Sequence, residues 1–295
     1  MAGLGDNGLR QGSGSSEPIV APGNLRRWSD ADGALIAMTD SVIVWDLETV
    51  PDLSGFAAAN QLVGKSDDEV RGALGDKFPK HVYHSIVCIG ALIVHRESDR
   101  WAVDAIGAPH VGERTEKQLI SAFVDKIAQL SPQLVTFNGS SFDLPVLRYR
   151  AMINSVPAPG LSLRPYFNRC TEDAVDLCDV LSSFSPNSKV TLDELSRIMG
   201  LPGKPDGIAG ADVERYFREG RIQEIANYCE TDVVNTYRIW LRYELFRGRL
   251  NEAEFEASEQ NLTEFIKARA TSRQQLAIGI KVEVASPTPP VLTIR

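Results

Sequence analysis

The stretch Val44-Trp45-Asp46-Leu47-Glu48-Thr49 carries the strongest indication of how this chain folds. It continues a short β-branched run that begins at Ser41, which predicts a strand. Because side chains alternate along a strand, Asp46 and Glu48 point to one face and Leu47 to the other. Neighbouring carboxylates repel each other, and a divalent cation with oxygen ligands would offset their charge. Acidic pairs at strand ends are also common on ordinary surfaces, so this pair needs support from the rest of the chain.

Three more strands are predicted downstream. Residues 85–94 and 101–106 are strand-like, and the polar turn Glu97-Ser98-Asp99-Arg100 separates them, so the first three strands are expected to be antiparallel. Residues 134–137 form a compact apolar run that stops at the turn signal Asn138-Gly139. A fourth strand is expected to end there.

Helical periodicity appears between and after these strands. Thr115 and Gln118 form a capping box ahead of an apolar stripe that ends at Ser131-Pro132. A long helix with one buried face is predicted from Ile222 to about Gly248, and another follows from Asn251. Shorter predicted elements are a helix with Pro145 in its first turn, a strand or short helix at 174–181, and a helix at 191–199. Strands interleaved with helices predict an α/β fold, with a mixed central sheet flanked by helices.

Composition sets the outer limits. The 295 residues, 43% of them hydrophobic and 24% charged, have the composition of a globular protein. We expect a flexible Gly- and Ser-rich tail at 1–24, one domain at 25–270, and an unassigned tail at 271–295. No apolar run is long enough to cross a bilayer, and the N-terminus lacks the order of a signal peptide. These features, with four cysteines in no regular framework, predict a cytoplasmic protein with reduced thiols and no membrane contact.

Two further segments carry acids in defined structural contexts. In Asn138-Gly139-Ser140-Ser141-Phe142-Asp143, a predicted strand runs into a turn and delivers Asp143 to a helix start. Taken alone, Asp143 would be interpreted as a helix cap. In Tyr228-Cys229-Glu230-Thr231-Asp232, residues four apart share a helical face, so Tyr228 and Asp232 lie on one edge beside the core. Taken alone, this pair would be a half-buried tyrosine bonded to a neighbouring aspartate.

These three segments, in this order, resemble the three exonuclease motifs of the DEDD superfamily, and most of all the proofreading domain of family B DNA polymerases. Asp46-Leu47-Glu48-Thr49 resembles the first motif, 138–145 the second, and 228–232 the third. Asn227 stands where the histidine subclass would carry histidine, so the third motif is of the tyrosine type. The resemblance covers about 40–245. Over this span the chain also resembles stand-alone bacterial proteins that are described as predicted exonucleases related to that proofreading domain.

The resemblance implies a ribonuclease H-like fold and a 3′-5′ exonuclease that hydrolyses phosphodiester bonds, from the 3′ end of single-stranded DNA, with two divalent ions, Mg²⁺ or Mn²⁺. Asp46 is expected to bridge both ions, and Glu48 and Asp232 to complete the site of the nucleophilic water. Asp143 is expected to support the second ion. Tyr228 is expected to orient the water, because its unperturbed pKa of about 10 makes it a poor base at neutral pH.

The same resemblance implies substrate contacts, at Leu47, Thr49, Asn138 and Phe142. An aromatic ring at position 142 could stack on a base, although Phe142 fits the core equally well. The net charge of −8 argues against broad adhesion to nucleic acid, so any contact is expected to be local and helped by metal. The candidate phosphate contacts, each of which could equally be solvated surface, are Arg148, Arg150, Lys189 and Lys204. Asp176 is expected to be structural, and the four histidines form no zinc motif.

Two alternatives stay open at this point. An exoribonuclease acting on RNA 3′ ends would use the same fold and metals, because neither distinguishes the sugar and no motif reveals a contact to the 2′-OH. A non-catalytic nucleic-acid-binding module of the same fold would be favoured by loss of one acid, and none is lost. A calcium-binding structural protein is disfavoured, because the chain has no EF-hand loop.

Overall fold

The computed structural model describes residues 40–75, 77–202 and 210–283, with side chains up to residue 271. The expected tail at 1–24, the start of the expected domain at 25–39, Lys204 and residues 284–295 lie outside the described residues.

The centre of the fold is a five-stranded sheet with the strand order β3-β2-β1-β4-β5. β1 (Ser41–Pro51), β2 (His84–Arg96) and β3 (Trp101–Gly107) are antiparallel neighbours. β4 (Gln133–Thr136) and β5 (Ala174–Asp176) run parallel to β1. The predicted mixed sheet with three antiparallel leading strands is confirmed, and its topology is that of the ribonuclease H-like fold.

The helices fall between and after the strands. They are α1 (Leu53–Ala59), α2 (Asp67–Leu74), η1 (His81–Tyr83), α3 (Glu116–Leu130), α4 (Asp143–Ile153), η2 (Pro159–Ser162), α5 (Leu177–Leu181), η3 (Pro186–Ser188), α6 (Leu192–Ile198), η4 (Gly210–Asp212), α7 (Val213–Arg218), α8 (Ile222–Phe246) and α9 (Glu252–Glu283). The predicted capping box of Thr115 and Gln118 opens α3, and α9 continues past residue 270, the expected end of the domain.

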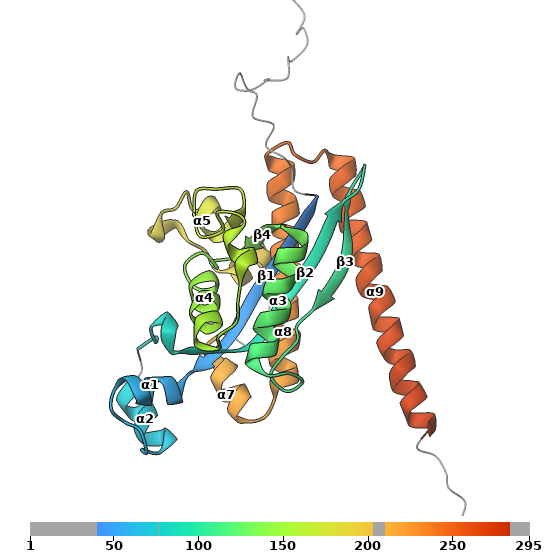
Figure 1. The fold of residues 1–295 in the computed structure, drawn as a ribbon. Helices are drawn as coiled ribbons and strands as arrows, with labels where there is room; N and C mark the ends of the chain where they lie inside the picture. The colour runs from blue at the N-terminus through green and yellow to red at the C-terminus, as the bar shows by residue number, and fades with distance from the viewer. Residues whose placement is uncertain (1–39, 76, 203–209, 284–295) are drawn as a thin grey trace, which may run out of the picture. The chain divides into compact units, whose positions relative to one another are not determined.

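Period-two alternation along β1 sends its apolar side chains into two separate cores. Ile43, Trp45 and Leu47 pack with residues of α3 and α4. Val42 and Val44 pack on the opposite face with residues of α8 and α9. Figure 1 shows α3 in front of the sheet and α8 behind it, with β1 in the middle. The central strand is therefore buried on both faces, as the near-continuous apolar run from 42 to 45 requires.

α9 covers the outer strand of the antiparallel half. The backbone N–H of Trp101 donates to Ser258 Oγ at 3.0 Å, and that of Val103 donates to Asn261 Oδ1 at 2.8 Å. Unpaired N–H groups on an outer strand can recruit another chain, so these side-chain acceptors close that edge.

Several elements differ from the predictions. β1 extends to Pro51, and the helices α1 and α2 were not predicted, although Ser66 and Glu69 form the capping box that opens α2. The ambiguous segment 174–181 contains both alternatives, because β5 leads directly into α5.

All four cysteines are free, as expected. Among the described residues, no helix combines the length and apolar character that a membrane span needs.

Candidate active site

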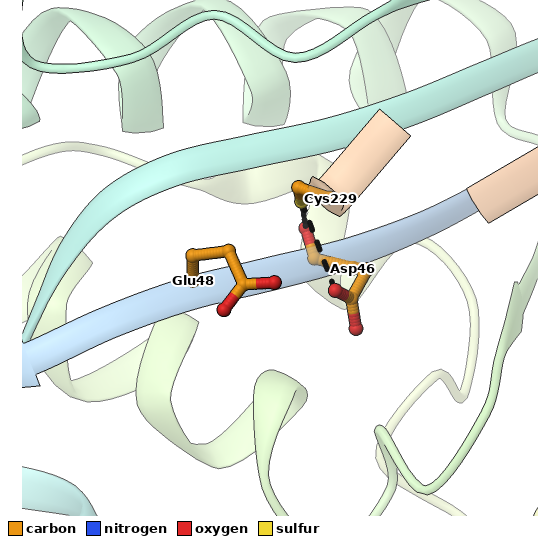
Figure 2. Close-up of side chains that lie close together, drawn as sticks. All are labelled: Asp46, Glu48 and Cys229. Atoms are coloured by element: carbon orange, nitrogen blue, oxygen red, sulfur yellow. Dashed lines mark hydrogen bonds between the residues drawn. The ribbon is translucent and has the colours of Figure 1, made fainter. Parts of the chain in front are cut away.

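The acids of β1 occupy the strand face that α8 covers. Asp46 and Glu48 continue the alternation of Val42 and Val44, and their partners across the antiparallel pair with β2 are Gly90 and Cys88. Glu48 is buried and Asp46 half-buried. Figure 2 shows the two carboxylates side by side along β1. The predicted shared face is confirmed, and it places both acids on the central strand of the sheet.

Asp143 reaches β1 where β4 stops. β4 pairs with β1 only through Val44, so the N–H of Leu47 has no strand partner on that side. Asp143 Oδ1 accepts from this N–H at 3.1 Å. Asp143 is the first residue of α4 and Phe142 is the N-cap, so the interpretation of Asp143 as a helix cap is wrong. The carboxylate instead takes the place that the next carbonyl of the ladder would have had.

Asp176 holds the loop that leads to Asp143. This buried carboxylate, at the end of β5, accepts from the backbone N–H groups of Asn138 at 2.7 Å and Ser140 at 2.9 Å. Asn138 has the left-handed φ of 71°, and a Cβ on Gly139 would lie 2.6 Å from the Thr136 side chain. The tight turn therefore needs both Gly139 and the acceptor, which agrees with the structural role expected for Asp176.

Tyr228 and Asp232 extend the cluster from α8. Both are buried, one helical turn apart, and Tyr228 forms a hydrogen bond to Asp232. Burial raises the pKa of Tyr228 far above its usual value, and the negative charges of Asp232, Glu48 and Asp46 raise it further. The phenol therefore stays protonated throughout the neutral range.

Cys229 is a member of the cluster that the sequence prediction treated only as part of the apolar stripe. Its Sγ–H donates to Asp46 O and Oδ2, each at 3.7 Å, and its ligand atom lies within 4.8 Å of those of Asp46 and Glu48 (Figure 2). The close approach depends on Gly90, because a Cβ there would lie 2.7 Å from Cys229 Sγ. The glycine of β2 opposite Asp46 was the sequence signal for this contact.

The electrostatics of these acids fit a divalent cation. Burial raises the pKa of Asp46 well above its usual value, and the charges of Asp143 and Asp232 add to the effect. Burial also raises the pKa of Asp143 to about 7, despite the hydrogen bond from Leu47 that favours its ionised form. Carboxylates that are costly to ionise together are the ligand set that a hard divalent ion stabilises. The residues present therefore suit a metal site of oxygen ligands.

A cavity of about 1130 Å³ opens at these acids. Of the nine residues predicted to form the site, seven line the cavity: Asp46, Leu47, Glu48, Thr49, Phe142, Tyr228 and Asp232. Asn138 and Asp143 do not line the cavity, although Asp143 accepts a hydrogen bond from the backbone N–H of Leu47 in β1. Thr49 Oγ1 is 3.0 Å from His84 Nδ1, and Phe142 is half-buried with its ring 5.0 Å from that of His84.

The candidate phosphate contacts have other partners. Arg150 is buried and forms ion pairs with Asp52 and Glu116, each at 2.6 Å, so its predicted role as a phosphate contact is wrong. Arg148 lies over the ring of Phe167 at 4.5 Å. Lys189 donates to Asn138 Oδ1 at 3.0 Å and pairs with the buried Asp179 at 2.9 Å.

A ribonuclease H-like fold with carboxylates gathered on its central strand defines a class of nucleases, and the family comparison agrees. The family described as "predicted 3′-5′ exonuclease related to the exonuclease domain of PolB" matches residues 76–278. This is more than half of the chain, which therefore belongs to that family. The matched span contains 138–143 and 228–232, whereas Asp46 and Glu48 precede it.

Individual relatives are more distant. A DNA polymerase of Archaeoglobus fulgidus is 28% identical over 132 residues, which cover 42% of this chain and 17% of the polymerase. Exonuclease I of E. coli in complex with a dT13 oligonucleotide is 13% identical, with a TM-score of 0.37 over 71% of this chain and 42% of that chain. The complex of Exonuclease I with SSB-Ct is 12% identical, with a TM-score of 0.36 over 68% of this chain and 44% of that chain.

Proposed function

We propose that this protein is a 3′-5′ exonuclease that hydrolyses phosphodiester bonds at the 3′ end of single-stranded DNA by a two-metal mechanism. The observation that carries the proposal is the meeting of acids from β1 and α8 at one cavity, with the charge of Asp143 from a third segment acting on Asp46, in a chain that belongs to an exonuclease family. Such clustering of acids is unfavourable without a cation, because each ionised carboxylate raises the pKa of its neighbours.

Each acid has a distinct role in the proposal. Asp46, Glu48, Asp143 and Asp232 would hold the divalent ions, with Asp46, Glu48 and Asp232 beside the attacking water and Asp143 as a further carboxylate ligand. When bound, the pair of divalent ions supplies an activated water and offsets the charge that develops on the phosphate. Asp143 is fixed for this purpose by its hydrogen bond from Leu47, and Asp46 by the thiol of Cys229.

Tyr228 positions the attacking water through its hydroxyl. Burial and the neighbouring acids raise the pKa of Tyr228 and favour the neutral phenol, so in this proposal the hydroxyl acts by hydrogen bonding and not by removing a proton. Because tyrosine stands at position 228, we assign the protein to the tyrosine subclass in this proposal.

The terminal nucleotides lie against Leu47, Thr49, Asn138 and Phe142 in this proposal. The half-buried ring of Phe142 lines the cavity, where it can stack on the last base. Asn138 is outside the cavity wall but exposed, and its amide is held by Lys189.

The proposal is tested by incubating the purified protein with 5′-labelled single-stranded DNA or RNA in the presence of Mg²⁺, Mn²⁺ or EDTA. We expect a ladder of DNA products shortened from the 3′ end, lost in EDTA. Asp46→Ala or Asp232→Ala should lower the rate more than about a hundredfold, because a catalytic ion contributes several kcal/mol and each ~1.4 kcal/mol is tenfold in rate.

Asp125→Ala is the matched control, since Asp125 is an exposed aspartate of α3 outside the cavity. A fully active Asp46→Ala protein, or cleavage that resists EDTA, would overturn the mechanism. Preference for RNA would favour the exoribonuclease alternative, and metal-dependent binding without cleavage would favour the non-catalytic one. A cytoplasmic location stays a prediction.

A further inference from the structure

The cavity extends beyond the acids to residues of two helices that the acids do not use. One wall carries Lys77 and Phe78, which follow α2 before η1, and the other carries Arg218 at the end of α7. An ion pair between Arg71 of α2 and Glu214 of α7 joins the two walls. Figure 1 shows α2 and α7 at the same end of the sheet, the end where β1 finishes. Chain segments far apart in sequence thus enclose one space.

Phe78 is the most unusual residue of this extension. It is 75% exposed, although a large aromatic side chain normally loses most of its contact with water. Its ring centroid lies 5.5 Å from that of Phe142 and 5.1 Å from that of His84. The ring therefore continues the aromatic wall of the acidic site outward, with much of its surface available to a ligand.

Lys77 and Arg218 supply positive charge on the two walls of the cavity. Both are exposed, and within the described part of the chain neither forms an ion pair, whereas Arg71 pairs with Glu214 and Arg215 with Asp212 at 2.8 Å. Away from Asp46, Glu48 and Asp232, the charged residues that line the cavity are four cations and two acids: Arg71, Lys77, Arg215, Arg218, Glu214 and Glu219. This part of the wall is therefore a local reversal of the chain's net charge of −8. An anionic ligand is the complement that such a reversal fits.

We propose that Lys77, Phe78 and Arg218 form a subsite that holds a single nucleic-acid strand on the 5′ side of its terminal nucleotide. The two cations contact successive phosphates, and Phe78 stacks on an unpaired base. A duplex presents its bases already paired and stacked, so its bases are not available to the ring. The inference rests on the proposed function, because the acids define where the 3′ end lies.

The test measures binding separately from cleavage. Fluorescence anisotropy of a 5′-fluorescein oligothymidylate with phosphorothioate linkages at its 3′ end, in Ca²⁺, reports the dissociation constant and its dependence on NaCl. Phe78→Ala should weaken binding about tenfold, because stacking on one base contributes about 1–3 kcal/mol and 1.4 kcal/mol is tenfold. Lys77→Ala with Arg218→Ala should weaken binding and reduce the slope of log K against log salt by about 1.4, or about 0.7 per phosphate contact.

Matched controls lie on exposed surface outside the cavity. Lys117→Ala with Arg197→Ala removes the same charge from α3 and α6, and Phe246→Ala removes an aromatic ring that is 84% exposed on α8. Control variants that weaken binding as much as the subsite variants, or an unchanged salt slope, would overturn the subsite. So would equal competition by an unlabelled blunt duplex, or no binding by the unaltered protein.

The two proposals fail in different ways. If the unaltered protein degrades single-stranded DNA with Mg²⁺ but the subsite variants bind as it does, the subsite is wrong and the proposed function stands. If the variants lose binding as expected but no DNA is cleaved with any metal, the subsite stands and the exonuclease proposal fails.

Discussion

The protonation state of Tyr228 depends on its buried, acidic surroundings. An exposed tyrosine titrates at about pH 10, whereas burial and three neighbouring acids raise the pKa of this phenol far above that value. The same acids that repel a phenolate would hold the metal ions of the proposed function. A neutral hydroxyl in this position can direct a nucleophile, and it cannot take a proton from it.

Tyr228→Phe is therefore expected to lower kcat by roughly a hundredfold, the effect of losing the alignment of one reacting group, with little change in the binding of single-stranded DNA. The pH profile of the remaining activity should keep the shape of the unaltered enzyme. Single-turnover rates over a pH series check both statements. Tyr149→Phe, at an exposed tyrosine of α4, is the control. Loss of an alkaline limb in Tyr228→Phe would identify the phenol as a base and contradict this role.

The contact between β2 and α8 sets the geometry of the acidic cluster at the level of elements. Gly90 lies opposite Asp46, and its missing side chain leaves room for Cys229 Sγ, for Cys229 O and for the Val233 side chain. α8 carries Tyr228 and Asp232, so the depth at which it packs on the sheet decides where these groups lie relative to β1.

Gly90→Ala is expected to force α8 outward, because the new Cβ would lie 2.7 Å from Cys229 Sγ. We expect a loss of about 1–3 kcal/mol in the free energy of unfolding, the usual cost of overpacking, and weaker binding of Mn²⁺. Urea unfolding and titration calorimetry measure the two effects. Gly107→Ala in β3 is the matched control, since nothing lies within 4 Å of its added Cβ. Equal unfolding free energies and equal Mn²⁺ affinities of the two variants would show that α8 tolerates a side chain at position 90, and would contradict the prediction.

At the scale of the whole molecule, the carboxylates of Asp46 and Asp143 couple stability to pH. Asp46 and Asp143 have raised pKa values in the folded protein, so the folded state binds more protons than the unfolded state between about the usual value of 3.8 and about 7 for Asp143. Their favourable contribution is present below the unfolded pKa and is lost as the pH rises through the folded pKa. The divalent ion of the proposed function would remove this loss by stabilising the ionised carboxylates.

Asp143→Asn isolates this coupling, because the amide keeps an acceptor for the Leu47 N–H but cannot ionise. Without metal, we expect the variant to unfold at a higher temperature than the unaltered protein, by a smaller margin near pH 5 than near pH 8, because the loss begins above pH 3.8 and is complete above about pH 7. Mg²⁺ should stabilise the unaltered protein more at pH 8 than at pH 5, and the variant less. Calorimetric unfolding at both pH values checks this, and a variant less stable than the unaltered protein at pH 8 without metal would contradict it.

The sheet and the acids on it were predictable because their signals are local. Alternation along 42–48 specifies one strand face, the capping box of Thr115 and Gln118 specifies a helix start, and a four-residue spacing puts Tyr228 and Asp232 on one edge of α8. These relations depend only on the periods of strands and helices.

Contacts between distant segments were decided by the tertiary structure alone. Arg150 was a candidate phosphate contact until packing placed it between Asp52 and Glu116. The contact of Asp143 with the Leu47 N–H depends on the early end of β4, which no local pattern predicts. The cavity wall of Lys77, Phe78 and Arg218 has no pattern in the sequence, because its members are brought together through space and share no period. The sequence by itself determined which residues are the candidates for the chemistry, because their motifs are local, and the packing of α2, α7 and α8 decided what surrounds them.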